Sequence, residues 1–288
     1  MLRFSVTLQA LAIAGVCAFW GLASIGQELP ATQRPGELSV AVYAEYPPFS
    51  SRDPKGRLVG IDVDIARALA ERLGMRLSLR EQGADESVED DLRNAVWKGH
   101  YLGGGTADVM LHVPIDPVFA MRNDQVAFVA PYYREHVLMA FREDKVEGGE
   151  LTPSSLLSLT VGVEIDTLPD TFLLSTMEGR LRDQVRHYRT LPIAVEALLA
   201  GEVDAVVGNA VEVQSFAAQK PGIGLSRVAL PGLRTTQWDL GAAVKANAGD
   251  DLGARLNEAM MGLQQSGTLD EIFRRYGADR VAAGITPR

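Results

Sequence analysis

The sequence contains almost no cysteine, since Cys17 is the only one in 288 residues. It lies in an apolar segment near the start of the chain, so the remainder can form no disulfide, bind no metal through thiolates and use no cysteine nucleophile. Histidine is also scarce, and the four histidines, at positions 100, 112, 136 and 187, lack the spacing of a zinc site. No Ser–His–Asp order is present. We therefore expect a protein that is not an enzyme, with no metal site.

Positive charge is in deficit as well. The chain has 28 Lys and Arg against 37 Asp and Glu, a net charge of −9, which argues against nucleic acid as a partner. It leaves open an anionic ligand in a local basic pocket. The apolar fraction of 47% and the charged fraction of 23% are those of a folded globular protein, and the length suffices for two modest domains.

The longest run without charge lies near the N-terminus. Residues 4–23 are uncharged and mostly apolar, one arginine precedes them, and small residues follow at Ser24 and Gly26. This pattern predicts a signal peptide over residues 1–26 and a polar linker over residues 27–37. The alternative is an uncleaved membrane anchor, because the run is near spanning length. Val16 before Cys17 argues against lipidation. We expect a periplasmic protein that meets the membrane only through this segment.

Strand-like runs alternate with helical patterns along the rest of the chain. The expected strands are residues 38–44, 76–81, 107–113, 159–165, 185–188, 203–209 and 239–247. The expected helices are residues 60–75, 167–174, 192–202, 250–267 and 267–277. This alternation predicts an α/β fold with a largely parallel sheet. The pattern restarts after the hydrophilic residues 141–155, which indicates two similar α/β units.

Four motifs, in order along the chain, carry a resemblance to a known family. They are EYPPFSSRDPKGRLVGIDVDIARALAERLG (45–74), MRNDQVAFVAPYYRE (121–135), LLAGEVDAVVGN (198–209) and LNEAMMGLQQSGTLDEIFRRYG (256–277). With them the chain resembles the bacterial extracytoplasmic solute-binding proteins of family 3, the polar amino acid type that serves ABC transporters. The resemblance covers roughly residues 38–278.

The resemblance implies a type II periplasmic-binding-protein-like fold of two α/β lobes, joined by two crossover strands near residues 135–141 and 238–244. Lobe 1 would comprise residues 38–138 and 241–288, and lobe 2 residues 139–240. The ligand would lie in the cleft between the lobes, at strand C-terminal ends and helix N-termini, and be trapped by hinge closure. The resemblance also implies a monomer whose partner is an ABC permease.

Two positions bear on the type of ligand. Family members that bind amino acids hold the α-carboxylate with an Arg and the α-ammonium with an Asp. Arg122 matches the Arg by its spacing to Phe128 and Pro131, although a solvated surface Arg is the alternative. Asn209 stands where the Asp is expected and cannot supply a negative charge. This argues against a free α-amino acid as the ligand.

The segment RNAVWKGHYLGGG, residues 93–105, is also unlike the family pattern. It places Trp97, Lys98, His100 and Tyr101 before three glycines. Aromatic rings can stack on a planar ligand, basic side chains can bind an anion, and glycine lets the backbone approach a ligand closely. We interpret the segment as a cleft wall. The alternative is that Trp97 covers the core of lobe 1 and the glycines only form a turn.

The residues His112-Val113-Pro114 and the later Pro-Tyr-Tyr-Arg are similar to a branch of the family found beside quinoprotein alcohol dehydrogenases. The resemblance implies pyrroloquinoline quinone as a bound ligand rather than a catalytic cofactor, and a quinoprotein dehydrogenase as a possible partner. That planar tricarboxylate would need aromatic surfaces and positive charge. The candidate aromatic residues are Tyr43, Tyr46, Phe49, Trp97 and Trp238. The candidate cations are Lys98, Arg122, Arg134 and Arg234.

Asp166 and Thr167 complete the candidate site, because they precede a predicted helix whose free N–H groups could face the cleft. Simple capping is the alternative there, and packing in the hinge is the alternative for Trp238. The main hypothesis is thus a periplasmic solute-binding protein for a planar or carboxylate-rich molecule. Three alternatives stay open: a polar amino acid-binding protein of an ABC importer, an accessory protein of a dehydrogenase without a small ligand, and a dehydratase-type enzyme on this fold.

Overall fold

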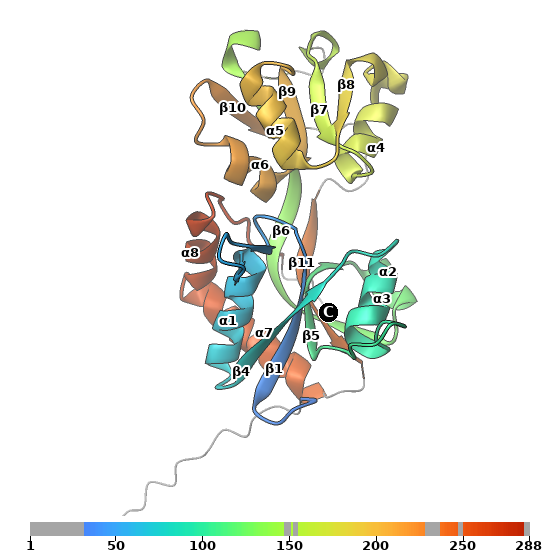
Figure 1. Cartoon of the computed structure of the whole chain (residues 1–288), viewed down its shortest axis with the longest axis vertical. Coiled ribbons are helices and arrows are strands. Elements are labelled where there is room, and N and C mark those ends of the chain that lie inside the picture. Colours follow the sequence, from blue (N-terminus) through green and yellow to red (C-terminus); the bar gives the residue numbers. More distant parts are fainter. Residues whose placement is uncertain (1–31, 147–150, 152–154, 228–236, 247–249, 285–288) are drawn as a thin grey trace, which may run out of the picture.

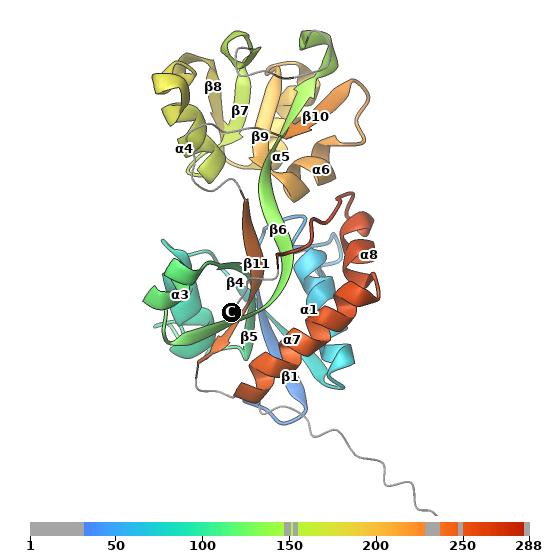
Figure 2. The same ribbon diagram turned by 180° about the vertical axis from the view of Figure 1, so that it is seen from behind.

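The computed structural model describes residues 32–146, 151, 155–227, 237–246 and 250–284, and these form two lobes, one above the other in Figures 1 and 2. The predicted signal peptide, the first part of the predicted linker and Arg234 lie outside the described residues. Among the described residues, no helix is both long and apolar enough to cross a bilayer.

Lobe 1, the lower lobe in Figure 1, is built on a sheet with the strand order β4, β1, β5, β11, β6. Its strands are β1 (Glu37–Tyr43), β4 (Arg76–Gln82), β5 (Val109–Ile115), β11 (Gln237–Lys245) and the first part of β6 (Val126–Arg142). Its helices are α1 (Ile61–Arg72), α2 (Val88–Leu92), α3 (Pro117–Arg122), α7 (Asp250–Gln265) and α8 (Thr268–Arg275). Helices α1, α7 and α8 cover one face of the sheet, and α2 and α3 cover the other (Figures 1 and 2).

Lobe 2 continues the same sheet with the second part of β6, followed by β9, β7 and β8, while β10 pairs with the other edge of β6. Its strands are β7 (Val161–Glu164), β8 (Val185–Tyr188), β9 (Ala205–Asn209) and β10 (Ile223–Arg227). Its helices are α4 (Leu168–Ser175), α5 (Leu191–Ala200) and α6 (Ala210–Ala217). The remaining short elements are β2 (Ser51–Arg52), β3 (Leu58–Val59), η1 (Arg93–Trp97), η2 (Glu143–Lys145), η4 (Ser155–Ser158), η5 (Thr176–Gly179) and η6 (Arg182–Gln184).

Strand β6 belongs to both lobes. It is 17 residues long, pairs with β11 as far as His136, and pairs with β9 from Val137 onward. The predicted crossing over residues 135–141 coincides with this passage. Residues 239–244 of β11, in contrast, pair with β5, so most of the second predicted crossing lies in the sheet of lobe 1. The lobe limits predicted at residues 138/139 and 240/241 fall inside β6 and β11.

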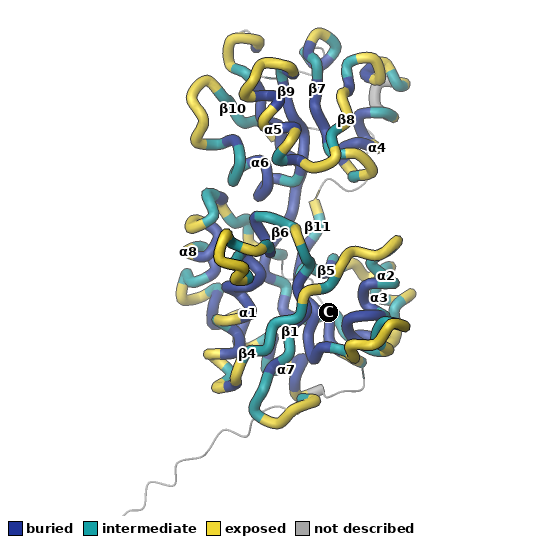
Figure 3. The backbone as a smooth tube through the Cα atoms, viewed as in Figure 1, coloured by how far each residue is buried: buried dark blue, intermediate teal, exposed yellow. Residues whose placement is uncertain are grey.

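Each lobe has a buried core on both faces of its sheet, as Figure 3 shows by the dark central strands. In β1, the alternation of side chains sends Val40 and Val42 toward α1 and α7, while Ala41 joins the cluster under α2 and α3. The second part of β6 repeats this, with Met139 on one face and Leu138 on the other. Sheets buried on both faces give the nearly continuous apolar runs from which the strands were predicted.

The predicted α/β fold of two lobes is confirmed. Each strand and helix expected from the sequence has a counterpart whose ends lie within three residues of the predicted ones. The expectation of a largely parallel sheet was wrong, because four of its strand pairs are parallel and four are antiparallel. The antiparallel pairs all involve β6 or β11, since β11 runs opposite to β5 and β6 in lobe 1, and β6 runs opposite to β9 and β10 in lobe 2.

Candidate functional site

Two adjoining cavities lie between the lobes, where β1, β5, β7 and β9 have their C-terminal ends. The inner cavity has a volume of about 420 Å³ and is lined by Tyr43, Ala44, Glu45, Tyr46, Ala84, Val88, His112, Pro114, Glu135, Asn209, Trp238 and Leu240. The outer cavity has a volume of about 620 Å³ and is lined by Ala44, Glu45, Tyr46, Pro47, Ser51, Arg52, Glu81, Glu164, Thr190, Pro192 and Glu212. Such volumes suit small-molecule ligands, and strand ends are where open α/β sheets bind them.

Six of the residues predicted to contact ligand line the inner cavity: Tyr43, Tyr46, His112, Pro114, Asn209 and Trp238. The strands at its floor are irregular. His112 and Ala130 have left-handed φ values of 62° and 53°, and the pairing of β11 with β5 and with β6 shifts at these points. A bulge of this kind changes the direction of a side chain. It brings the His112 ring against the aromatic side chains that follow β1.

His112 is the centre of an aromatic cluster. Its ring centroid lies 4.3 Å from that of Phe49, 5.1 Å from that of Tyr46 and 6.3 Å from that of Tyr43, all with the rings edge to face. Tyr46 also stacks on Phe49 at 5.3 Å. Phe49 is fully buried and lines neither cavity, so it supports the cluster from behind.

Buried carboxylates hold these rings in place. Asp62, at the start of α1, accepts one hydrogen bond from the Tyr132 hydroxyl, at 2.8 Å. Its other carboxylate oxygen lies 3.1 Å from His112 Nδ1. The Tyr43 hydroxyl donates to Asp91 at 2.7 Å. Burial first, and then the charge of Asp91, raise the pKa of Tyr43 far above its usual value. Tyr43, which lines the inner cavity, therefore stays neutral.

Glu135 is the most deeply buried carboxylate of the inner cavity, with 1% of its surface exposed. Its Oε1 accepts hydrogen bonds from the Tyr133 hydroxyl at 2.7 Å, the His136 N–H at 2.8 Å and the Ala210 N–H at 3.1 Å. Its Oε2 has no hydrogen-bond partner among the described residues. Burial raises the pKa of Glu135 to about 7, because loss of hydration favours the neutral carboxyl group.

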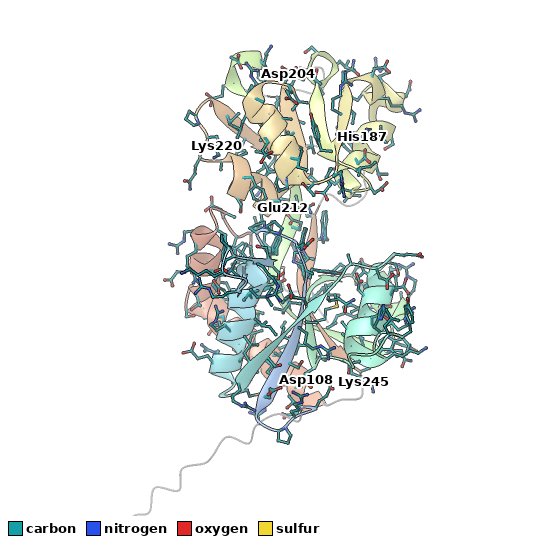
Figure 4. All side chains as sticks on the ribbon, in the orientation of Figure 1. Asp108, His187, Asp204, Glu212, Lys220 and Lys245 are labelled. Atoms are coloured by element: carbon teal, nitrogen blue, oxygen red, sulfur yellow. The ribbon has the colours of Figure 1, made fainter. Side chains whose placement is uncertain are left out.

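Glu212 lies at the edge of lobe 2 that faces lobe 1 (Figure 4). Its Oε2 accepts a hydrogen bond from Asn209 Nδ2 at 2.9 Å and another from the Tyr46 hydroxyl at 3.3 Å, so a residue of lobe 1 contacts lobe 2 here. Burial, with the charges of Glu164 and Glu135, raises the pKa of Glu212 to about 8. The negative charge expected at position 209 is absent there, but the structure places the Glu212 carboxyl group directly beside Asn209.

The outer cavity is rich in carboxylates too. Glu45, Glu81, Glu164 and Glu212 line it, against one cation, Arg52, which forms an ion pair with Glu81. Glu164, at the end of β7, accepts a hydrogen bond from the Leu191 N–H at the start of α5, at 2.8 Å. Burial raises the pKa of Glu164. A cation brought into this cavity would find several acceptors with little positive charge to compete for them.

The segment 93–105 lines neither cavity. Trp97 ends the π-helical turn η1 and packs, partly buried, on the cluster that contains Ala41 and Val96. Lys98 is exposed, and His100 Nδ1 accepts a hydrogen bond from the Leu102 N–H within the loop. The structure thus matches the alternative interpretation of a core cover followed by a turn. Ligand contact by Trp97, Lys98 and His100 was predicted from residue types alone. Residue types do not determine whether a segment faces the cleft or the outer surface of the lobe.

Three other predicted residues also lie outside the cavities. Arg122 is on the outer surface of lobe 1, where it pairs with Glu89 at 3.8 Å and lies over the Phe119 ring. Thr167 caps its own helix, donating to the Glu164 carbonyl and accepting from the Asp170 N–H, and the Asp166 N–H donates to the Asp170 carboxylate. The spacing of Arg122 resembled the family pattern, and its place on the outer surface matches the alternative of a solvated Arg.

Arg134, another of the candidate cations, makes two hydrogen bonds to Asp239, at 2.7 and 3.0 Å, and lines neither cavity.

Sequence reasoning missed Glu135 and Glu212. Glu135 was passed over as the start of a crossing strand, yet a glutamate inside the apolar run YYREHVLMAF is itself a signal of a buried functional carboxylate. Glu212 stands three residues after Asn209 on the first turn of α6, which places both side chains on one face of the helix. Among the described residues no cluster of His, Cys, Asp and Glu has the geometry of a metal site.

Comparisons with known proteins agree with this architecture. Residues 38–97 match the bacterial extracellular solute-binding proteins, family 3. The chain is 26% identical over 248 residues to a probable histidine-binding protein of Neisseria gonorrhoeae, covering 85% of this chain and 84% of that protein. It is also 26% identical over 241 residues to a putative ABC transporter arginine-binding protein of Escherichia coli, covering 82% and 88%.

Among solved structures, an ancestral cationic amino acid solute-binding protein superposes with a TM-score of 0.68 at 21% identity, covering 84% of this chain and 96% of that one. This likeness shows the fold, two α/β lobes of the type II periplasmic-binding arrangement. The matched region, residues 38–97, and the curated relatives make the chain similar to the bacterial extracellular solute-binding proteins of family 3.

Proposed function

We propose that the protein is the periplasmic solute-binding component of an ABC importer and captures a small organic cation of about the size of a basic amino acid. The observation that carries this proposal is the charge of the cleft. Five carboxylates line the two cavities, namely Glu45, Glu81, Glu135, Glu164 and Glu212. Among the described residues that line the cavities, the one arginine is paired with Glu81, and His112 is paired with Asp62.

The size of the electrostatic interaction between the ligand and these carboxylates decides between cationic and anionic ligands. Opposite unit charges about 4 Å apart attract by about 4 kcal/mol at the effective dielectric of a protein surface, and like charges repel by as much. A ligand ammonium or guanidinium group would therefore be stabilised in this cleft. A tricarboxylate such as pyrroloquinoline quinone would be repelled by each ionised glutamate, whereas a cation would favour the ionised form of Glu135 and Glu212, whose pKa values are raised. The aromatic residues Tyr43, Tyr46 and Trp238 suit either class, because ring faces attract cations as well as planar ligands.

The relatives support the same direction. Two are named as histidine- and arginine-binding proteins, and the solved neighbour is named for cationic amino acids. Among these proteins none is named as an enzyme or as a partner of a dehydrogenase. Glu164, a carboxylate that an enzyme on this fold could use as an acid or base, already accepts a hydrogen bond from the Leu191 N–H. We therefore favour reversible binding over dehydratase chemistry.

The test is a titration of the purified protein, freed of bound solute, with a panel of small cations, small carboxylates and pyrroloquinoline quinone. The panel of cations includes the basic amino acids and simple amines. Intrinsic fluorescence should respond through Trp238, which lines the inner cavity. We expect at least one cation to bind about 100-fold more tightly than any anion, a difference of about 2.7 kcal/mol.

Loss of the fluorescence response in Trp238→Phe, with a retained response in Trp97→Phe, would assign the signal to the cleft. Tighter binding of the quinone or of an acidic amino acid than of every cation would overturn the proposal.

A further inference from the structure

We infer that the ligand of this cleft is an organic cation without a carboxylate group, an amine or guanidine rather than an amino acid, and that Glu135 Oε2 receives its positive charge. The inference rests on the proposed function and narrows it. It follows from what the cleft offers to a carboxylate, which is very little, and from what it offers to a cation.

The main-chain donors that usually hold a ligand carboxylate are already occupied. Anions in open α/β folds bind at helix N-termini. Here the Leu191 N–H at the start of α5 donates to Glu164, at 2.8 Å, and the Ala210 N–H at the start of α6 donates to Glu135, at 3.1 Å. Beside them the Asp166 N–H donates to Asp170, at 3.0 Å. Pro192 in the first turn of α5 has no N–H to offer. Carboxylates of the protein take the places that a ligand carboxylate would need.

Side-chain cations do not replace these donors. Within the described lining of the two cavities, Arg52 is the only Lys or Arg, and it is paired with Glu81 at the exposed rim. Arg122, which by its spacing would hold an α-carboxylate, is on the outer surface of lobe 1 with Glu89. A carboxylate bound in the inner cavity would therefore be buried next to Glu135, with no Lys or Arg among the described residues that line this cavity.

A cation meets the opposite situation in the inner cavity. Glu135 is almost completely buried, its Oε1 is fixed by three hydrogen bonds, and its Oε2 has no hydrogen-bond partner in the part of the chain that the structure describes. Unpaired buried carboxylate oxygens are rare in folded proteins because they lose their hydration. Tyr43, Tyr46 and Trp238 line the same cavity and present aromatic surface that attracts cations. An ammonium or guanidinium group would satisfy Oε2 and replace the lost hydration.

A second acceptor lies where the two cavities meet. Tyr46 lines both cavities, and its hydroxyl donates to Glu212, which lines the outer one. A ligand with one positive group at Glu135 could place a second polar or positive group toward Glu212 and Glu164. This arrangement is suited to a diamine or to an amine that also carries a guanidine or an imidazole, because both acceptors are carboxyl groups.

The experiment compares pairs of compounds that differ only in the carboxylate: agmatine with L-arginine, cadaverine with L-lysine, and histamine with L-histidine. Dissociation constants are measured by calorimetry on the purified protein. We expect the amine of at least one pair to bind at least tenfold more tightly than its parent amino acid. In Glu135→Gln, which keeps the Oε1 acceptor and removes the charge, that amine should bind at least tenfold more weakly.

Glu258→Gln is the matched control, because Glu258 is an exposed residue of α7 that lines neither cavity. It should leave the amine's affinity unchanged. Circular dichroism establishes that each variant is folded, and Glu212→Gln provides a second test of the cleft charge if Glu135→Gln does not fold.

The outcomes distinguish cation binding in general from a preference for cations without a carboxylate. Tighter binding of the amino acid in all three pairs would overturn the present inference and leave the proposed cation-binding function intact. Failure of all six compounds to bind, with binding of an anion in the earlier panel, would overturn both. Amine binding that is unchanged in Glu135→Gln and in Glu212→Gln would remove the assigned charge partner and with it the inference.

Discussion

Aromatic and basic side chains gather in two regions of lobe 1, around the C-terminal ends of β1 and β5 and in the segment 93–105. In the first region, Tyr43, Tyr46 and His112 meet buried carboxylates and open onto lobe 2. In the second, Trp97 packs on the core, and Tyr101 is 87% exposed. Similar residue types thus line a cavity between the lobes in one place and form a covering loop in the other. The difference lies in what the backbone around them faces, since the C-terminal ends of β1 and β5 point toward lobe 2 and the segment 93–105 lines neither cavity.

Glycine substitutions give the largest expected contrast between the two regions. Gly60 has φ +140°, and a Cβ there would lie 2.2 Å from the Phe49 carbonyl oxygen, whereas Gly103 has φ +98° and open space around it. Gly60→Ala combines backbone strain with overlap and should lower the free energy of unfolding by about 4 kcal/mol. Gly103→Ala adds only strain, about 1 kcal/mol. Denaturant unfolding of both variants measures this.

Gly60→Ala should also weaken ligand binding, because Phe49 supports the rings of Tyr46 and His112. Equal destabilisation by the two substitutions would mean that the contact between residues 49 and 60 is not tight in solution.

The two regions should also differ in how they respond to pH. The pKa of Glu135 is raised to about 7 and that of Glu212 to about 8 by burial. The folded protein therefore holds protons that the unfolded chain releases near pH 4.5, so the contribution of these two groups to stability is fully present below that pH and is lost as pH rises to about 8. Both shifts act in the same direction, so the ligand-free protein should lose stability across this window.

Glu212→Gln should make this pH dependence shallower, and a bound cation should offset it by favouring the ionised carboxylates. Thermal unfolding from pH 5 to pH 9, with and without ligand, checks both statements. A melting temperature that rises steadily over this range in the ligand-free protein would contradict the assigned burial of the two glutamates.

Substitutions of Trp97 and Trp238 compare the segment 93–105 with the inner cavity by means of the same residue type. Trp97→Ala removes a partly buried ring from the core cluster and should cost about 2 kcal/mol of stability, with ligand affinity unchanged. Trp238→Ala removes a ring from the inner cavity and should weaken binding about tenfold, or 1.4 kcal/mol. Denaturation and calorimetry on the same preparations separate the two effects. Loss of affinity in Trp97→Ala at full stability would restore the segment 93–105 as a cleft wall.

Much of the fold was predictable because it depends on patterns local in the sequence. Apolar runs such as residues 203–209 and helical periodicity such as residues 60–75 reflect burial on one or both faces, which the sequence records directly. The site was predictable where it follows a strand end, as at Tyr43, Tyr46 and Asn209. Glu212 and Glu135 could not be placed in this way, because their role depends on contacts across the lobes, with Tyr46 and with the Ala210 N–H.

The smallest expected effect concerns the hydroxyl that joins the lobes. Tyr46→Phe keeps the ring and removes the 3.3 Å hydrogen bond to Glu212. A single hydrogen bond to a charged or shared carboxyl group contributes about 1 kcal/mol, so affinity should fall about fivefold while the free energy of unfolding changes little. Tyr43→Phe is the matched control, because its hydroxyl bonds to Asp91 within lobe 1. It should lower stability by leaving a buried carboxylate with one partner fewer, and affect affinity less than Tyr46→Phe does. If both variants changed affinity equally, the contact between the lobes would have no special part in binding, and the ring faces alone would account for the contribution of these tyrosines.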